Sequence, residues 1–173
     1  PVAIPPLKTL SPAMLALTGA ALLTLSFPNW NQPWFAWFAL VPWFLLLTRV
    51  SERRAFGWSW LIGFIFFASS MWWLVHVTIA GWISLCAFLG LFFGLVGWLS
   101  QASTPSVRSI GHPLILSSIW VSIEYLRSHL FSGLGWNLLG YSQSSWITLI
   151  QIADVTGVWG LSFLIVWVNA ALA

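Results

Sequence analysis

Charged side chains are scarce in this sequence, and their scarcity excludes most classes of protein. Asp, Glu, Lys and Arg make up 5% of the 173 residues, whereas apolar residues make up 60%. A soluble globular domain carries about 25% charged residues, so this chain is too poor in charge to be one. Disordered chains are poor in apolar residues, which excludes disorder as well. The composition therefore predicts a polytopic membrane protein.

Cysteine and runs of basic residues are almost absent too. The single cysteine, Cys86, has no partner for a disulfide within the chain. It lies in an apolar run without a neighbouring His or Lys to activate its thiol, so we interpret it as a small core residue. The longest basic run is the pair Arg53-Arg54, and a nucleic-acid surface needs many more phosphate-neutralising groups. We therefore expect no nucleic-acid partner.

The histidines are too scattered to form a metal site. They are His76, His112 and His129. Their spacing is not that of metal ligands, and the cysteine is not beside any of them. The sequence also contains no G-x-S-x-G, Walker or zinc-protease motif, and no nucleophile can be paired with a base. We expect no metal, no cofactor and no catalytic residue in this segment, and interfacial hydrogen bonds for the histidines.

Long apolar runs are what the sequence has in place of charge. A helix of about 20 apolar residues crosses the hydrocarbon core of a membrane. Runs near this length occupy residues 10–27, 33–48, 55–75, 79–99, 113–131 and 157–173. They are continuous rather than alternating, which favours helices over a β-barrel. We therefore expect an all-α bundle of about six transmembrane helices, with residues 1–173 forming one membrane domain.

Proline and glycine predict two local features of these runs. Pro42 lies inside the second run and should kink it or make it irregular, because proline lacks an N–H and clashes with the preceding turn. Gly90 and Gly94 are four residues apart in the fourth run. This small-xxx-small spacing is typical of closely packed membrane helices.

Positive charges collect on one side of the predicted bundle. They are Lys8, Arg49, Arg53, Arg54 and Arg108. The connections on the opposite side contain no Lys or Arg, and the remaining positive residue lies within a span. Because positive residues stay on the cytoplasmic side of a membrane, we expect a multi-pass protein with its N-terminus in the cytoplasm.

The long connection at 132–156 differs from the other loops. It has too many Gly, Ser, Asn and Gln for a span, and too many Trp, Leu and Ile for a free loop. We expect it to lie along the outer membrane boundary, with an amphipathic helix near 145–154. Asp154 is the acidic residue of this loop and is expected to cap a turn with Thr156. The fifteen Trp residues fit such a boundary, because indole is apolar with one N–H to satisfy.

Glu124 and Arg127 are the charges that most need an explanation. They are three residues apart within a span, so they share one helix face. A charge inside a membrane marks by default a functional site or an internal pair. The favoured interpretation is a structural ion pair that anchors the outer connection against the bundle. Direct contact with a lipid headgroup or substrate, and a role in proton transport, stay open as alternatives.

Several short motifs occur in an order that is similar to a known family. They are Ser26-Phe27-Pro28, Trp72-Trp73, Trp120 with Glu124-Tyr125-Leu126-Arg127, Gly135-Trp136, Gly140-Tyr141-Ser142-Gln143, and Ala153-Asp154 with Gly157 and Gly160. In this spacing they resemble the N-terminal membrane domain of the apolipoprotein N-acyltransferases. The resemblance covers nearly the whole chain from residue 20. One departure is Gly135, where many members have proline before the tryptophan.

The resemblance implies a function that extends beyond this chain. Members of that family sit in the bacterial inner membrane and transfer an acyl chain from a phospholipid to the N-terminal diacylglyceryl-cysteine of apolipoproteins. Their catalytic glutamate, lysine and cysteine belong to a periplasmic nitrilase-like domain, which follows after one further span. We therefore expect this segment to be inactive alone, to anchor the enzyme and to present its lipid substrates. The substrate-binding, lipid-binding or structural candidates are Glu124, Arg127, Trp136, Tyr141 and Gln143.

A different class of protein remains as the alternative. A small non-enzymatic transporter, or a structural membrane protein, could also be built around Glu124 and Arg127. A transporter is expected to place ionisable groups or broken helices near mid-membrane, in repeated halves. The sequence has no internal repeat, and its polar groups collect near the outer boundary. These two features favour the acyltransferase interpretation.

Overall fold

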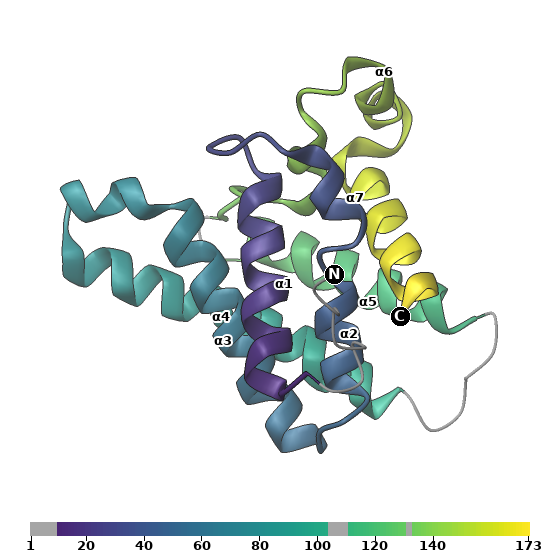
Figure 1. The fold of residues 1–173 in the computed structure, drawn as a ribbon. Coiled ribbons are helices and arrows are strands. Elements are labelled where there is room, and N and C mark those ends of the chain that lie inside the picture. The colour runs from purple at the N-terminus through teal and green to yellow at the C-terminus, as the bar shows by residue number, and fades with distance from the viewer. Residues whose placement is uncertain (1–9, 104–110, 131–132) are drawn as a thin grey trace, which may run out of the picture.

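The computed structural model describes residues 10–103, 111–130 and 133–173, and within these ranges every regular element is helical (Figure 1). The elements are α1 (Pro12–Ser26), η2 (Pro33–Trp37), α2 (Val41–Leu47), α3 (Glu52–Ser70), η3 (Trp72–His76), α4 (Ile79–Ala102), α5 (His112–His129), η4 (Leu139–Gln143), α6 (Ile147–Ile150) and α7 (Ala153–Leu172). The expected all-α class is confirmed for the described residues. Lys8 and Arg108 lie outside them.

The helices follow the apolar runs, and proline accounts for the break in the second one. That run contains η2, which ends at Trp37, and α2, which begins at Val41. Pro42 stands in the first turn of α2, where a missing N–H costs no helical hydrogen bond. The expected irregularity is therefore confirmed. It separates two short helices rather than kinking one long helix.

Two of the described helices, α4 and α7, are long and apolar enough to cross a membrane. Helix α1 is short at 15 residues, and α3 begins with the charged residues Glu52, Arg53 and Arg54. Six crossings are therefore not confirmed, and the number of crossings stays a prediction.

The two turns that flank η2 and α2 lie at opposite ends of the molecule. Figure 1 shows α6 and the turn after α1 at the top, and the turn between α2 and α3 at the bottom. Helix η4 packs against η2 and α7 at the same end as α6. We call this end, which holds η2, η4 and α6, the outer end.

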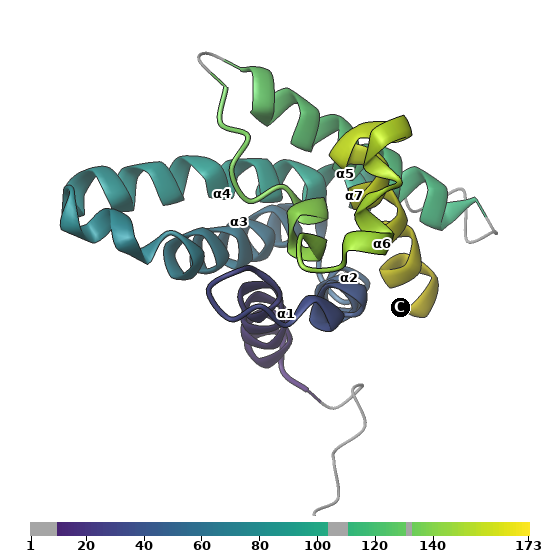
Figure 2. The same ribbon diagram turned by 90° about the horizontal axis from the view of Figure 1, so that it is seen from above.

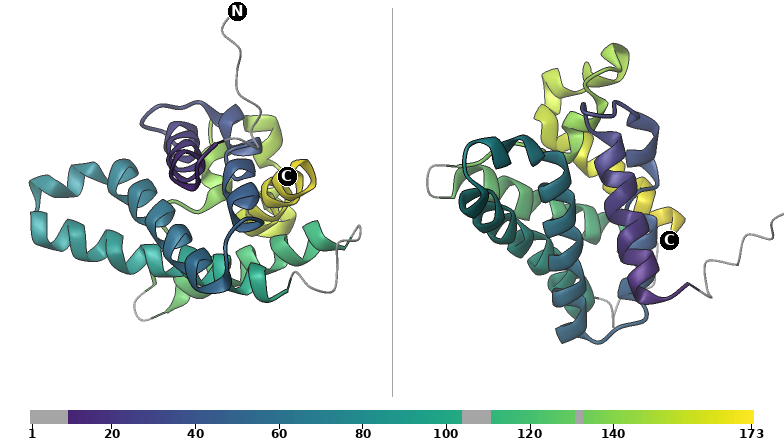
Figure 3. Two further views of the ribbon diagram at one scale, coloured as in Figure 1. Left: turned by 60° about the horizontal axis from the view of Figure 1, so that its bottom comes forward. Right: turned by 60° about the vertical axis from the view of Figure 1, so that its left-hand side comes forward.

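Helices α3 and α4 form a long hairpin that projects away from the other helices (Figures 2 and 3). Glycine brings the two helices together. A Cβ added at Gly90 would lie 3.0 Å from the carbonyl oxygen of Trp60, and one added at Gly94 would lie 2.8 Å from the Phe56 ring. The close packing expected from the glycine spacing is therefore confirmed.

Aromatic rings fill the place where α2, α3, α4 and α5 meet. Trp43 of α2 is fully buried, and its Nε1 donates a hydrogen bond to Ser59 Oγ at 2.8 Å. Its ring stacks on Phe93 and meets the edge of Trp120, with ring centroids 5.5 and 5.7 Å apart. Cys86 is buried in α4, as expected of a core residue.

One side chain of α7 compensates for the break between η2 and α2. Asn169 is fully buried. Its Oδ1 accepts the backbone N–H of Leu40 at 2.9 Å, and its Nδ2 donates to the carbonyl of Ala36 at 2.8 Å. Backbone N–H and C=O groups outside a helix need hydrogen-bond partners when they are buried in an apolar interior. Asn169 supplies the partners for two such groups.

The outer connection folds differently from the prediction. The amphipathic helix expected near 145–154 is wrong in extent, because α6 covers only Ile147–Ile150. A second break follows at Gly157, whose φ of 65° and ψ of 180° interrupt α7 in a conformation that is essentially restricted to glycine. The expected cap is wrong as well, because Thr156 Oγ1 donates to the carbonyls of Ile152 and Gly157 rather than to Asp154.

Candidate functional site at the outer end of α5

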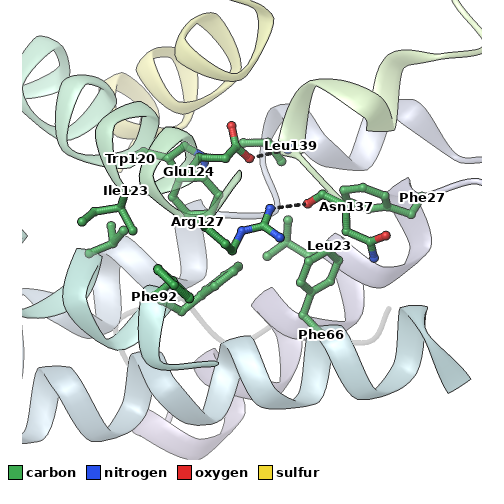
Figure 4. Close-up of a pocket in the computed structure, with 12 residues that line it drawn as sticks. Leu23, Phe27, Phe66, Phe92, Trp120, Ile123, Glu124, Arg127, Asn137 and Leu139 are labelled. Carbon is green, nitrogen blue, oxygen red and sulfur yellow. Dashed lines mark hydrogen bonds between the residues drawn. The ribbon is translucent and has the colours of Figure 1, made fainter. Parts of the chain in front are cut away.

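Arg127 is buried, with 5% of its surface exposed, and it binds the backbone of the segment that follows α5. Its Nη1 donates to the carbonyl oxygens of Leu134 at 3.1 Å and Trp136 at 2.8 Å. Its Nη2 lies 3.5 Å from the carbonyl oxygen of Asn137. The guanidinium also lies over the ring of Phe67, 5.3 Å from its centroid. Arg127 therefore joins α3, α5 and the segment 133–139 (Figure 4).

Glu124 is equally buried and binds the end of the same segment. Its Oε1 accepts the backbone N–H of Leu139 at 2.6 Å. The side chains of Ser162 and Trp120 lie near its carboxyl group. Among the described residues, however, Oε2 of Glu124 and Nε1 of Trp120 are buried without a hydrogen-bond partner. The carboxyl group thus holds the first residue of η4 in place.

The expected pairing of Glu124 with Arg127 is wrong, because their side chains do not bind each other, whereas the expected anchoring of the outer connection by these two residues is confirmed. The two groups interact electrostatically, but within the described part of the chain their hydrogen bonds go to backbone atoms of 133–139. The reason is the irregular backbone of this segment, whose carbonyl and N–H groups would otherwise be buried without partners. Helix spacing places the two side chains on one face, but it does not determine what they bind.

The space beside these two residues is small. Glu124 and Arg127 line a cavity of about 20 Å³ together with rings such as Phe66 and Phe92 (Figure 4). A single buried water needs about 10–15 Å³ of such space. The cavity therefore has no room for a lipid or a peptide. This geometry does not favour direct substrate contact by either side chain.

A serine at the end of α3 links three parts of the outer end. The carbonyl oxygen of Ser70 accepts from Asn29 Nδ2 at 3.1 Å, and its Oγ accepts from Asn137 Nδ2 at 2.6 Å. Asn137 has a φ of 53°, a left-handed conformation that Asn adopts more readily than most residues. The turn after α1, helix α3 and the segment 133–139 are held together in this way.

Gln143 and Gly140 attach η4 to its neighbours. Gln143 is fully buried; its Oε1 accepts from Trp37 Nε1 at 3.1 Å and its Nε2 donates to the carbonyl of Pro33 at 3.0 Å. The N–H of Gly140 donates to Ser162 Oγ at 2.9 Å. A Cβ at Gly140 would lie 2.6 Å from the carbonyl oxygen of Val158, so this close approach requires glycine.

The other two candidate residues are on the surface. Trp136 and Tyr141 are about half exposed, at 48% and 46%, and Trp136 packs on Trp73 with ring centroids 5.5 Å apart. They belong to a set of exposed aromatic side chains, here called the aromatic rim: Trp30, Trp34, Trp72, Trp73, Trp136 and Tyr141. Such rings suit a membrane boundary, because indole and phenol combine an apolar body with a polar tip.

Sequence reasoning placed the five candidates in one region but missed other polar residues that bind the irregular backbone. Ser70, Asn137 and Asn169 were not identified. The signal that points to such residues is a polar side chain close to a helix break, because such side chains often satisfy the freed backbone groups.

The histidines and the cysteine do not form a site of their own among the described residues. Within the described ranges, no three His, Cys, Asp or Glu side chains gather as a metal site would require. The ring Nδ1 of His129 lies 2.9 Å from the carbonyl oxygen of Tyr125, which is the hydrogen bond expected for an interfacial histidine. His112 Nδ1 is buried without a partner in the described residues, so the expectation is not met there.

Comparison with known proteins identifies the family. The model of the apolipoprotein N-acyltransferase N-terminal domain matches residues 19–171. Apolipoprotein N-acyltransferase of Geobacter metallireducens is 35% identical over 92% of this chain and 32% of its own length. Apolipoprotein N-acyltransferase 1 of Treponema denticola is 33% identical over 92% of this chain and 30% of its own length. Apolipoprotein N-acyltransferase of Chlorobaculum tepidum is 36% identical over 91% of this chain and 30% of its own length. The chain thus spans about a third of these relatives, and it belongs to the apolipoprotein N-acyltransferase family.

Proposed function

We propose that this chain is the membrane part of an enzyme of bacterial lipoprotein maturation. The whole enzyme transfers an acyl chain from a phospholipid to the N-terminal diacylglyceryl-cysteine of an apolipoprotein. The part described by this chain anchors the enzyme in the inner membrane and presents both lipid substrates at its outer end. The names of the relatives and the match to the N-terminal domain of the family support this proposal.

The presenting role is supported by the hydrogen bonds that the two buried charged residues of α5 make. Burial of a charge costs several kcal/mol unless it is well hydrogen-bonded. Arg127 and Glu124 meet this cost by binding the backbone at Leu134, Trp136 and Leu139. The segment is thereby fixed in one conformation, with Trp136 exposed beside Trp73. An ordered aromatic surface at a membrane boundary suits lipid substrates better than a free loop does.

The chemical step is not assigned to any residue of this chain. Cys86 is a buried thiol, and the described residues provide no group of acids and histidines around it. A nucleophile needs a base within hydrogen-bond reach. We therefore assign the transfer reaction to the remainder of the enzyme, with this segment inactive alone.

Acyl transfer by the full-length enzyme in phospholipid vesicles tests the presenting role. Arg127→Met should lower the transfer rate to a diacylglyceryl peptide at least about tenfold, which corresponds to about 1.4 kcal/mol, because the surface at Trp136 loses its support. Arg53→Met is the matched control, since Arg53 is exposed at the start of α3 and far from the rim. An unchanged rate in Arg127→Met would refute the presenting role.

We also propose a membrane topology for this chain. It crosses the membrane several times, its N-terminus lies in the cytoplasm, and its outer end lies on the opposite side. The turn after α1 and the turn between α2 and α3, which lie at opposite ends of the molecule, support this topology (Figure 1). In a Cys86→Ala background, Ser144→Cys should react with an impermeant thiol reagent added to cells with a permeable outer membrane. Glu52→Cys should resist the reagent. Both positions are exposed on the protein, so labelling at 52 would reverse the proposed orientation.

A further inference from the structure

We infer that the open groove between α1 and α3 binds one acyl chain of a glycerophospholipid, whose phosphate and ester oxygens meet Trp30 and Trp72. The groove has a volume of about 720 Å³, within the range of about 300–1,000 Å³ that is common for ligand sites. The inference uses the proposed position of the outer end at the membrane boundary. It does not depend on the acyl-transfer reaction.

The body of the groove is apolar. Leu17, Ala21 and Leu25 from α1 face Ile65 from α3. The hydroxyl residues Thr24 and Ser69 also line it, and none of the described lining residues is Asp, Glu, Lys or Arg. The three α1 residues extend over about 12 Å of helix at 1.5 Å per residue. An uncharged, elongated and flexible hydrocarbon chain fits walls of this kind.

The outer end of the groove has a different chemistry. Trp30 and Trp72 line it and are 59% and 55% exposed. Asn29 beside them is held by its hydrogen bond to the carbonyl of Ser70, which fixes the turn that carries Trp30. The indole N–H of tryptophan donates a hydrogen bond, and the indole ring has no hydrogen-bond acceptor. This end is therefore complementary to the phosphate and ester oxygens of a phospholipid, and its described residues offer no carboxylate to an ammonium group.

A groove retains such a lipid better than a flat helix face does. In a bilayer the surrounding tails are as apolar as leucine, so contact with apolar walls brings no hydrophobic gain. Retention must come from dispersion contacts with two walls instead of one, and from the hydrogen bonds at the polar end. Phospholipids are also the most concentrated molecules at this surface, which favours occupancy by mass action.

Photo-crosslinking of the full-length protein tests the inference. The probe is a phosphatidylglycerol with a diazirine on one acyl chain, mixed into palmitoyl-oleoyl-phosphatidylglycerol vesicles. Labelling at Leu17 should exceed labelling at Leu91, a residue of α4 that is also exposed, by about fivefold, equivalent to about 1 kcal/mol. Equal labelling of the two residues would overturn the inference, and this comparison needs no variant.

A filled groove provides the second readout. Ala21 is exposed in the groove and Ala80 is exposed on α4 outside it. Ala21→Phe should lower labelling at Leu17 about fivefold, about 1 kcal/mol, whereas Ala80→Phe should leave it unchanged. The double change Trp30→Phe and Trp72→Phe keeps the rings but removes both N–H donors, and should lower labelling about threefold. Labelling that is insensitive to Ala21→Phe would overturn the inference.

The same vesicles separate this inference from the proposed function. Selective labelling of Leu17 without any acyl transfer by the wild-type protein would support the groove and refute the proposed function. Acyl transfer with uniform labelling of Leu17 and Leu91 would do the reverse.

Discussion

The outer end and the α3–α4 hairpin are held together by different means. In the hairpin the backbone stays helical, and glycines let the two helices approach until Gly90 lies against Trp60. At the outer end the backbone leaves the helix, and buried polar side chains bind it. Arg127 and Glu124 do so for the segment 133–139. The comparison teaches that packing is sufficient where a chain satisfies its own backbone, and that charges or amides are needed where it does not.

The break between η2 and α2 shows the same principle with a neutral group. Asn169 binds Leu40 and Ala36 there and is fully buried. Gln143 binds Pro33 and Trp37 in a similar way. Arg127 binds three carbonyl oxygens, and Asn169 binds two backbone groups of the break.

The largest effect is expected from Arg127→Met. It removes the partner of three carbonyl oxygens and leaves Glu124 buried without the nearby positive charge. Loss of one member of a buried charged network costs about 3–5 kcal/mol. Thermal unfolding of the full-length protein in detergent measures this loss, with Arg53→Met as the control. If the two variants have equal unfolding temperatures, charge does not hold the outer end.

A smaller loss is expected from Asn169→Leu. The leucine keeps the volume of the side chain but leaves the N–H of Leu40 and the carbonyl of Ala36 buried without a partner. Each unsatisfied group costs about 1–3 kcal/mol. The unfolding free energy should fall without a change in helix content. Gln151, an exposed amide after α6 with an ordinary right-handed backbone, supplies the control Gln151→Leu, and a similar loss there would argue against the role of Asn169.

The stability of the α3–α4 hairpin should depend on the volume of the side chains between its helices rather than on polar side chains. Gly90→Leu places a side chain against the backbone of Trp60 and Phe64, and overpacking of this kind costs about 1–3 kcal/mol. Gly57 has open space around its Cβ position, so Gly57→Leu should cost little. Unfolding temperatures of the two variants provide the test, and equal values would mean that α3 and α4 are not closely packed at Gly90.

The sequence predicted the positions of the helices better than their contacts. Apolar runs locate α1, α4 and α7 because each run must be helical to satisfy its backbone in lipid. Pro42 located the break in the second run. The partner of Leu40, by contrast, is Asn169, 129 residues away, and no local pattern connects them. Glu124 and Arg127 were placed on one face, but their shared partner is a segment whose path depends on Asn137 and Gly140.

The short helices of the outer connection were beyond prediction for a related reason. Apolar and polar residues near 145–154 match an amphipathic helix over a short window. In the structure α6 ends at Ile150, α7 begins at Ala153, and a second break follows at Gly157. Tertiary contacts outweigh local propensity in segments of this length.

Hydrogen exchange at the backbone N–H of Leu139 tests most directly whether buried charge holds the outer end. In the wild-type full-length protein this N–H is bound to Glu124 and should exchange slowly. In Glu124→Leu, peptides covering 133–143 should exchange faster, whereas peptides from α3 and α4 should keep their wild-type rates. Unchanged protection of 133–143, or equal acceleration in the α3–α4 hairpin, would contradict the account.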